Sequence, residues 1–264
     1  MKEIILDELK EIQLEMLKVV DDFCRINGIK YFLCAGTLIG AVRHQGYIPW
    51  DDDIDIMMLR PDYDKFIHSF NNHYEDLDVC APELNWNYYA PYANVFHNKT
   101  LLIEDNMNHM GMELGVKIDI FPLDAIPQNE LRYTIERNLV LRLNGILMAK
   151  RIKCVSSLSR NQKIARILFS QVPYSIIQKT IKIIATSVKF DDSTDVFLRT
   201  FDISKPMRAN KALFNNSVYV PFEKYYFPIP SGYDEYLRIR YGNYMQLPPE
   251  SERIPHHGFK AFWK

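Results

Sequence analysis

The sequence of 264 residues contains no apolar run that approaches the roughly 18 residues needed to cross a bilayer. Its first residues turn acidic at once and have no apolar core, unlike a secretory signal peptide. Low-complexity tracts and internal repeats are also missing, so a disordered or fibrous protein is not indicated. We therefore expect a globular protein that is made and kept in the cytoplasm.

Cysteine is scarce, and no two of the four cysteines are spaced as in a CxxC metal or redox motif. Each stands among apolar neighbours. Reduced, buried thiols are usual for a cytosolic protein. We expect them at all four positions, which are Cys24, Cys34, Cys80 and Cys154.

Net charge is almost absent, at −1, but this total hides an uneven distribution. Residues 142–189 hold ten Lys or Arg and no Asp or Glu, which leaves 22 basic and 33 acidic residues elsewhere. The basic segment is either a solvated helical face or a surface for an anionic inner leaflet or a polyanionic, lipid-linked glycan. Charge alone also allows nucleic acid, but no recognition motif is present, so we expect no nucleic-acid partner.

Hydrophobic periodicity predicts a mixed α/β protein of the α+β class, with a small sheet followed by a helical region. We expect a sheet-containing core at 1–128, a basic helical subdomain at 129–200 and a C-terminal segment at 201–264. That last segment is predicted to hold one helix, at 234–241, among ordered loops. Other predicted helices cover 4–24, 38–43, 61–70 and most of 129–189, and predicted strands cover 31–34, 54–58, 92–96, 101–104 and 116–121.

Two aspartates, Asp53 and Asp55, alternate with isoleucines and form the most informative pattern. On a strand, this period of two places both carboxylates on one face. Neighbouring carboxylates repel, and a divalent cation would neutralise them. Hard oxygen ligands suit Mg²⁺ or Mn²⁺. Asp119 is a lone acid on another apolar strand, and joining the same metal site would remove the cost of burying it alone.

A calcium-binding loop is excluded, because counting from Asp51 places Ile56 where that loop needs glycine. A solvated acidic turn is disfavoured, because Trp50 and an apolar strand flank the aspartates. Upstream, Gly36 and Thr37 stand between a predicted strand and helix, where backbone N–H groups can bind phosphate. A strand, Gly-Thr, a short helix, a loop and Asp-hydrophobic-Asp on a second strand together form the pattern of the nucleotidyltransferase superfamily.

These motifs resemble the LicD family, which includes the fukutin-related proteins. The resemblance runs from about residue 30 to residue 257. It is most specific in the first motif, at 36–44 and 48–55, and continues at 117–124. It implies a nucleotidyltransferase-like fold, with a small mixed sheet flanked by helices, in which residues 201–264 complete the active site. Shorter matching motifs are Pro221-Phe222-Glu223, Phe227-Pro228-Ile229-Pro230, Tyr241-Gly242-Asn243-Tyr244 and Pro248-Pro249-Glu250.

The resemblance also implies an activity: transfer of phosphocholine from CDP-choline to a sugar hydroxyl of a cell-surface glycan precursor, a teichoic acid or a lipopolysaccharide, with release of CMP. By motif position, Asp53, Asp55 and Asp119 match the metal-binding and catalytic carboxylates. A lipid-linked glycan acceptor would suit a peripheral position on the inner face of the membrane. Two alternatives stay open: transfer of another phosphorus-linked group, such as ribitol phosphate or a nucleotidyl group, and a catalytically inactive, membrane-associated binding protein of the same fold.

Further residues are candidate substrate contacts. We expect the backbone of Gly36 and the hydroxyl of Thr37 to contact the donor phosphates. Arg43 and Lys117 can pair with phosphate oxygens. Choline is a quaternary ammonium without an N–H to donate, so aromatic faces are its natural site, and Trp50 beside the acidic pair is our candidate.

Overall fold

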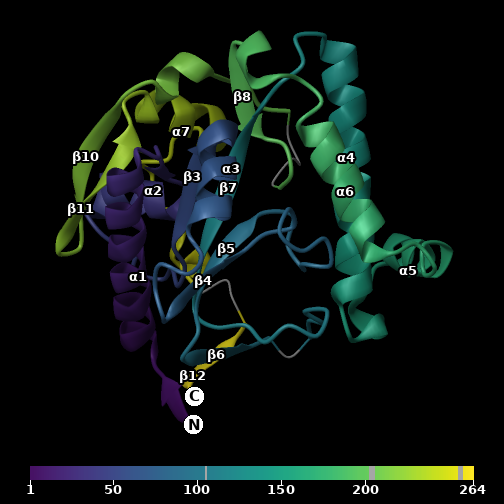
Figure 1. The fold of residues 1–264 in the computed structure, drawn as a ribbon, viewed down its shortest axis with the longest axis horizontal. Helices are drawn as coiled ribbons and strands as arrows, with labels where there is room; N and C mark the ends of the chain where they lie inside the picture. Colours follow the sequence, from purple (N-terminus) through teal and green to yellow (C-terminus); the bar gives the residue numbers. More distant parts are fainter. Residues whose placement is uncertain (105, 202–205, 255–257) are drawn as a thin grey trace.

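The computed structural model describes residues 1–104, 106–201, 206–254 and 258–264. Within them a seven-stranded mixed sheet has the order β2-β3-β7-β5-β4, with β8 beside β7 and β9 beside β8 (Figure 1). The β3–β7 pair is parallel and the other pairs are antiparallel. The predicted α+β class is confirmed. The strands of this sheet are β2 (Phe32–Leu33), β3 (Asp55–Leu59), β4 (Leu77–Cys80), β5 (Ala93–His97), β7 (Lys117–Ala125), β8 (Asp195–Leu198) and β9 (Ala209–Asn210).

Three helices from the first part of the chain pack against the central strands: α1 against β7, α2 against β3, and α3 against both. Helix α1 ends at Gly28, whose φ of 61° is the left-handed conformation that glycine adopts at helix ends. Pro61 lies in the first turn of α3, as expected, because its missing N–H has no partner there in any case. The helices are α1 (Leu6–Asn27), α2 (Ala35–His44) and α3 (Arg60–Ser69).

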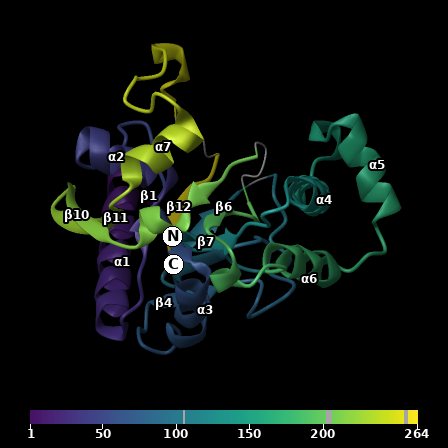
Figure 2. The ribbon, with the colours of Figure 1, turned by 90° about the horizontal axis from the view of Figure 1, so that it is seen from above.

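The predicted helical region forms α4 (Glu130–Arg151), α5 (Arg160–Leu168) and α6 (Tyr174–Ala185). Helices α4 and α6 lie side by side, and α5 lies at the edge of the molecule farthest from α1 in both views (Figures 1 and 2). This region has an apolar cluster separate from the main core, because the helices bury side chains against one another. The cluster contains Val140, Ile146, Leu147, Tyr174, Ile177 and Ile181.

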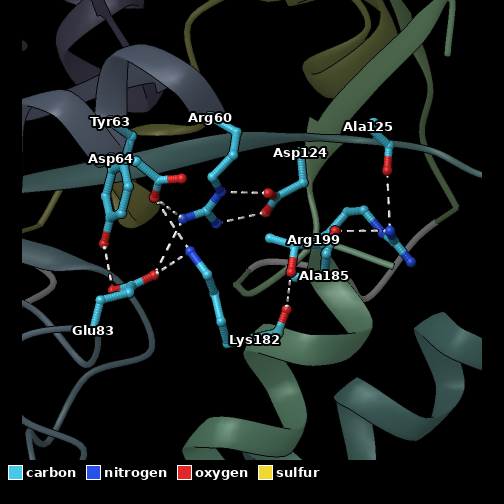
Figure 3. A network of polar contacts seen from close by, with 10 residues as sticks. Arg60, Tyr63, Asp64, Glu83, Asp124, Ala125, Lys182, Ala185 and Arg199 are labelled. Atoms are coloured by element: carbon cyan, nitrogen blue, oxygen red, sulfur yellow. Dashed lines mark hydrogen bonds and ion pairs between the residues drawn. The ribbon is translucent and has the colours of Figure 1, made fainter. Parts of the chain in front are cut away.

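A buried polar network joins α6 to α3 and β7 (Figure 3). Arg60 donates from Nε to Asp124 Oδ1 at 2.6 Å and from Nη2 to Asp124 Oδ2 at 2.9 Å. Glu83 accepts from Arg60 at 3.1 Å and from Lys182 at 2.9 Å. Arg199 donates to one backbone carbonyl of β7 and one of α6, at 3.0 and 2.8 Å. Helix α6 is therefore fixed to the sheet by charge-assisted bonds as well as by apolar contacts.

The C-terminal part departs from the prediction of ordered loops around one helix. The predicted helix is present, but β10 and β11 form an antiparallel hairpin before it. Strand β12 pairs with β1 and β6, so the two ends of the chain lie side by side (Figure 1). The prediction of loops is wrong for both segments. The elements concerned are β1 (Lys2–Ile4), β6 (Thr100–Ile103), β10 (Ser217–Phe222), β11 (Tyr225–Pro230), α7 (Tyr233–Tyr241) and β12 (Lys260–Trp263).

The cysteines are free, as predicted, but they are not all buried. Cys24 and Cys34 are buried and Cys80 is half-buried, whereas Cys154 is exposed in the connection between α4 and α5. The prediction of a buried thiol is therefore wrong at Cys154. Its apolar neighbours in the sequence do not lie in a common core, and Val155 beside it is itself 50% exposed.

Among the described helices, none combines the length and the apolarity needed to span a bilayer. His256 and His257, whose role the sequence leaves open, lie outside the described residues. The three-part division of the chain stays a prediction. Strand β8, from the predicted second part, pairs with β7 of the first part, so the main sheet is built from both.

Candidate active site

The two strands that carry the predicted carboxylates are neighbours in the sheet. Strands β3 and β7 pair in parallel, and their register places Asp55 directly opposite Asp119. Asp53 lies two residues before β3, because the regular strand begins only at Asp55. All three side chains line one cavity of about 300 Å³. Residues far apart in the sequence are thus brought to the same place by a single strand pairing.

The cavity is enclosed by parts of the chain that the sequence assigned to different regions. Lys117, at the start of β7, lies beside the three carboxylates. Helix α4, from the predicted basic subdomain, forms one part of the wall. The helical region therefore belongs to the site and is not merely appended to it. The residues from α4 are Asn144, Leu147, Met148 and Arg151.

Asp119 is oriented by three donors. Lys117 Nζ lies 2.6 Å from Asp119 Oδ1 and 2.8 Å from Oδ2. The amide of Asn94, opposite Asp119 on β5, donates to Oδ1, and the Tyr92 hydroxyl donates to Oδ2 at 3.3 Å. Burial alone would lower the pKa of Lys117, but the adjacent Asp119 raises it well above its ordinary value. The pair is therefore a carboxylate held against an ammonium group.

Asp55 stands in the opposite electrostatic situation. Burial raises the pKa of its carboxyl well above the usual range, and the charges of Asp53 and Asp119 raise it further, while Lys117 acts in the other direction. Its backbone N–H donates to Thr37 Oγ1 at 2.9 Å, which fixes the start of β3. A carboxylate that is both desolvated and crowded by like charges is costly without a cation nearby.

The donor set fits a hard divalent cation. When ionised, three carboxylates beside one ammonium leave two negative charges, and oxygen atoms are the ligands that Mg²⁺ and Mn²⁺ prefer. Asp53, Asp55 and Asp119 would hold such an ion. Ligand atoms of Asp51, Asp52 and Asp53 also lie within 4.8 Å of one another, so Asp53 belongs to a second acidic group in the preceding loop.

Gly36 and Thr37 lie in the first turn of α2 and contact the aspartate segment. A Cβ atom at Gly36 would lie 2.4 Å from Asp51 Oδ2, so any larger residue there would have to displace that carboxylate. Thr37 is buried and accepts the Asp55 N–H. Ala35 just before them has a φ of 46°, which is rare for a residue with a side chain. Gly36 and Thr37 thus help to position the aspartates, and their contact with the donor phosphates stays a prediction.

Comparison with known proteins agrees with this geometry. The profile of the family described as LicD/FKTN/FKRP, nucleotidyltransferase domain, matches residues 28–138, which include all three carboxylates. The lipopolysaccharide cholinephosphotransferase LicD of Haemophilus influenzae is 32% identical over 267 residues, covering 96% of this chain and 97% of that protein. The chain belongs to the LicD family. It is therefore an enzyme of the transferase class.

Two uncharacterised Rickettsia proteins resemble shorter pieces of this LicD-family chain. The protein from Rickettsia typhi is 45% identical over 58 residues, covering 22% of this chain and 19% of that protein. The protein from Rickettsia prowazekii is 48% identical over 48 residues, covering 18% of each. These two matches are local, whereas the match to the Haemophilus protein extends over nearly the whole chain.

Two predicted substrate contacts of the LicD-family chain are not part of the described cavity lining. Arg43 donates to His44 Nε2 at 2.9 Å and to the Tyr244 carbonyl at 2.7 Å, so it ties α2 to the segment after α7. The Trp50 ring faces the Arg253 guanidinium, with 5.7 Å from Arg253 Cζ to the ring centroid. Neither Arg43 nor Trp50 is among the described residues that line the cavity. Their contacts with substrate stay predictions.

Two buried amides that were not predicted from the sequence position the site. Asn94 has no exposed surface and donates to Asp119. Gln13 of α1 donates to the Asp52 carbonyl at 3.1 Å and to the Lys117 carbonyl at 3.4 Å, which links the acidic loop to the start of β7. A signal was present in both cases, because each amide interrupts an otherwise apolar face of a helix or strand. A buried polar side chain needs a partner.

Aromatic rings and one arginine in the cavity were also missed. Tyr92, Phe121 and Phe201 pack together, with ring centroids 4.6 Å, 5.0 Å and 5.4 Å apart, and all three line the cavity. Arg151 lies at the end of α4, with its Cζ 4.6 Å from the centroid of the Tyr89 ring. In the sequence, these residues resemble ordinary core or surface residues, and only the fold brings them to the carboxylates.

Proposed function

We propose that the protein transfers phosphocholine from CDP-choline to a sugar hydroxyl of a cell-surface glycan and releases CMP, with a divalent cation bound at the carboxylates. The observation that carries the proposal is the pairing of Asp55 with Asp119 in one cavity with Asp53. The relative that matches nearly the whole chain is named as a lipopolysaccharide cholinephosphotransferase. Lipopolysaccharide is therefore the first acceptor to test, ahead of teichoic acid.

The reaction requires positioning and charge neutralisation more than covalent catalysis. The sugar hydroxyl oxygen forms a bond to the phosphorus that bears choline, the bond from that phosphorus to the bridging oxygen breaks, and CMP leaves with that oxygen. When bound by Asp53, Asp55 and Asp119, Mg²⁺ or Mn²⁺ would neutralise the donor diphosphate. A carboxylate of this cluster accepts the hydroxyl proton, and Asp119 is our candidate.

The rest of the cavity supplies groups for both ends of phosphocholine. Among the described residues of its lining, Lys117 and Arg151 are the cationic ones, and both can pair with phosphate oxygens. Tyr92, Phe121 and Phe201 present ring surface to a trimethylammonium group, which aromatic faces bind at about 0.5–2 kcal/mol. We therefore place choline on these three rings. The earlier candidate, Trp50, is not supported by the cavity lining.

The test is CMP release from CDP-choline with Mg²⁺ and a lipopolysaccharide acceptor. Asp55→Asn and Asp119→Asn keep the side-chain volume but remove a charge, and we expect each to lower kcat at least about a hundredfold. Asp22→Asn is the matched control, because Asp22 is on α1 with its side chain 48% exposed, and we expect unchanged turnover. Turnover near the wild-type rate in either site variant would refute the assignment.

A donor screen separates this proposal from its alternatives. Wild-type protein should release CMP faster from CDP-choline than from CDP-ribitol at equal concentrations. A preference for CDP-ribitol would change the transferred group and leave the metal site intact. No turnover of any nucleotide donor, with correctly folded protein, would favour an inactive binding protein.

A further inference from the structure

Helix α5 places its apolar side chains toward solvent. None of its nine residues is buried. Ile164, Ile167 and Leu168 are 47%, 73% and 71% exposed, and their spacing places them on one face of the helix. The face toward the body instead includes Ala165 and Arg166, which are half-buried. An amphipathic helix of a globular protein usually has the reverse orientation, so something outside the described chain is expected to cover this face.

The orientation of α5 is fixed by polar bonds. Arg166 Nη1 donates to the carbonyls of Ala149 and Ile152 at 3.3 and 2.6 Å, at the end of α4. Lys150 Nζ donates to the carbonyls of Phe169 and Ser170 at 2.8 and 3.1 Å, in the turn that follows α5. The helix is thus attached to α4 at two places, and rotating its apolar face inward would break these bonds.

The charge around this face identifies the kind of partner. Arg160 and Lys163 are exposed on α5 itself, and Arg160 is four residues before Ile164 on the same helix face. The sequence segment that contains α5, residues 142–189, has ten basic and no acidic side chains. A second copy of the chain would bring two such surfaces together, and they would repel. An apolar helix face in a segment of the chain that carries only positive charge is instead the pattern of helices that lie in an anionic bilayer surface.

We propose that α5 docks the protein on an anionic lipid bilayer, with Ile164, Ile167 and Leu168 inserted among the acyl chains and with Arg160 and Lys163 at the headgroups. The protrusion of α5 from the body, visible in both views, lets this face reach a flat surface (Figures 1 and 2). Helix α4, to which α5 is bonded, also lines the active-site cavity. Docking would therefore hold the cavity near a lipid-carried acceptor.

The test is co-sedimentation of the full chain with vesicles, which needs no substrate and so does not depend on the proposed reaction. Vesicles of phosphatidylcholine alone are compared with vesicles that also contain phosphatidylglycerol, each at low and high salt. We expect binding only to the phosphatidylglycerol vesicles, weakened by high salt because screening reduces the attraction. Arg160→Gln with Lys163→Gln should weaken binding about thirtyfold, since each charge near an anionic surface contributes about 1 kcal/mol.

Ile167→Ser with Leu168→Ser should weaken binding about tenfold or more, because the inserted apolar area is lost. The matched control is Ile26→Ser, because Ile26 is 82% exposed and belongs to α1, the helix on the opposite side of the molecule from α5 (Figure 1). This variant should bind as wild type does. Equal thermal melting of all variants shows that the fold is kept.

Three results would overturn the proposal. The first is no binding to phosphatidylglycerol vesicles at low salt. The second is binding that both double variants retain in full. The third is a dimer in sedimentation velocity that Ile167→Ser with Leu168→Ser dissociates, which would assign the face to a second copy of the chain.

Discussion

Replacing Arg60 should destabilise the protein more than replacing Asp124, although the two residues form one buried ion pair. The Asp124 side chain is 1% exposed, and within the described part of the chain it accepts two hydrogen bonds, both from Arg60, at 2.6 and 2.9 Å. Arg60 has further partners, Glu83 at 3.1 Å and Asp64 at 3.3 Å, and its Cζ lies 4.7 Å from the Tyr63 ring centroid. The two members of the pair therefore depend on each other to different degrees.

Arg60→Met leaves Asp124 buried without its partner, whereas Asp124→Asn leaves Arg60 with two carboxylates. Breaking a buried ion pair costs about 3–5 kcal/mol. We expect Arg60→Met to lower the free energy of unfolding by about 4–5 kcal/mol and Asp124→Asn by about 2–3 kcal/mol. The double variant Arg60→Met with Asp124→Leu should be more stable than Arg60→Met alone, because no unpaired charge stays in the core.

The assay is equilibrium unfolding in urea at neutral pH, with midpoint and slope both fitted. Asp22→Asn serves as the surface control, since it removes only an exposed i,i+4 pair with Lys18, worth about 0.3–0.5 kcal/mol. The reasoning would be refuted if Asp124→Asn were the more damaging change, or if both single variants behaved like the control.

Three further predictions concern the site and the free thiols. Gly36→Ala should lower kcat about tenfold, because a Cβ there would lie 2.4 Å from Asp51 Oδ2 and displace that carboxylate, which is in the same acidic group as Asp53. Unchanged steady-state kinetics would contradict this. Arg151→Gln should raise KM for CDP-choline about tenfold with a smaller effect on kcat, since a charged hydrogen bond to phosphate contributes about 1.5–3 kcal/mol; unaltered KM would remove Arg151 from donor binding. Hydrogen bonds with Ser156 and Ser157 lower the pKa of the Cys154 thiol to about 7. The fraction of thiolate, and with it the rate of alkylation, should therefore rise as the pH is raised, with a midpoint near pH 7. Burial raises the pKa of Cys34 to about 11, so mass spectrometry should find Cys34 unmodified under the same conditions, and equal labelling of both would contradict the structure.

The carboxylates could be located from the sequence because their signal is local. Asp53 and Asp55 alternate with isoleucines, and Asp119 is a lone acid among apolar residues. Carboxylates on such apolar strands are costly unless they share a partner, so the sequence itself points to these three residues. The structure brings all three to one cavity by pairing β3 with β7. The exact start of β3 was not predictable, because both Asp53 and Asp55 fit the period-two pattern and only the latter is in the regular strand.

The C-terminal hairpin could not be predicted, because its strands carry prolines that usually indicate loops. Pro221 is on β10, and Pro228 and Pro230 are on β11. Proline cannot donate to a strand ladder, but in a two-stranded hairpin each strand has a free edge, where a missing N–H costs little. Strands β1 and β12 were missed for another reason: each is short, and they lie at opposite ends of the sequence.

The substrate side of the site depends on long-range packing. The sequence indicates Trp50 because it is beside the aspartates. In the structure its ring faces Arg253, and the described rings that line the cavity come from other segments, including β7 and residue 201, so the role of Trp50 stays a prediction. The buried amides of Asn94 and Gln13 could have been recognised from the sequence as side chains that need a partner. A buried amide within an apolar pattern indicates a partner, although the pattern does not say which one.

The most direct measurement of the central claim is the binding of Mn²⁺, followed by its electron paramagnetic resonance signal, in the absence of any acceptor. Wild-type protein should bind the ion saturably, with a higher affinity when CDP-choline is present. Asp53→Asn, Asp55→Asn and Asp119→Asn should each weaken binding at least about tenfold, while Asp22→Asn should bind as wild type does. Mn²⁺ affinity that is unchanged in all three site variants would contradict a cation site at these carboxylates.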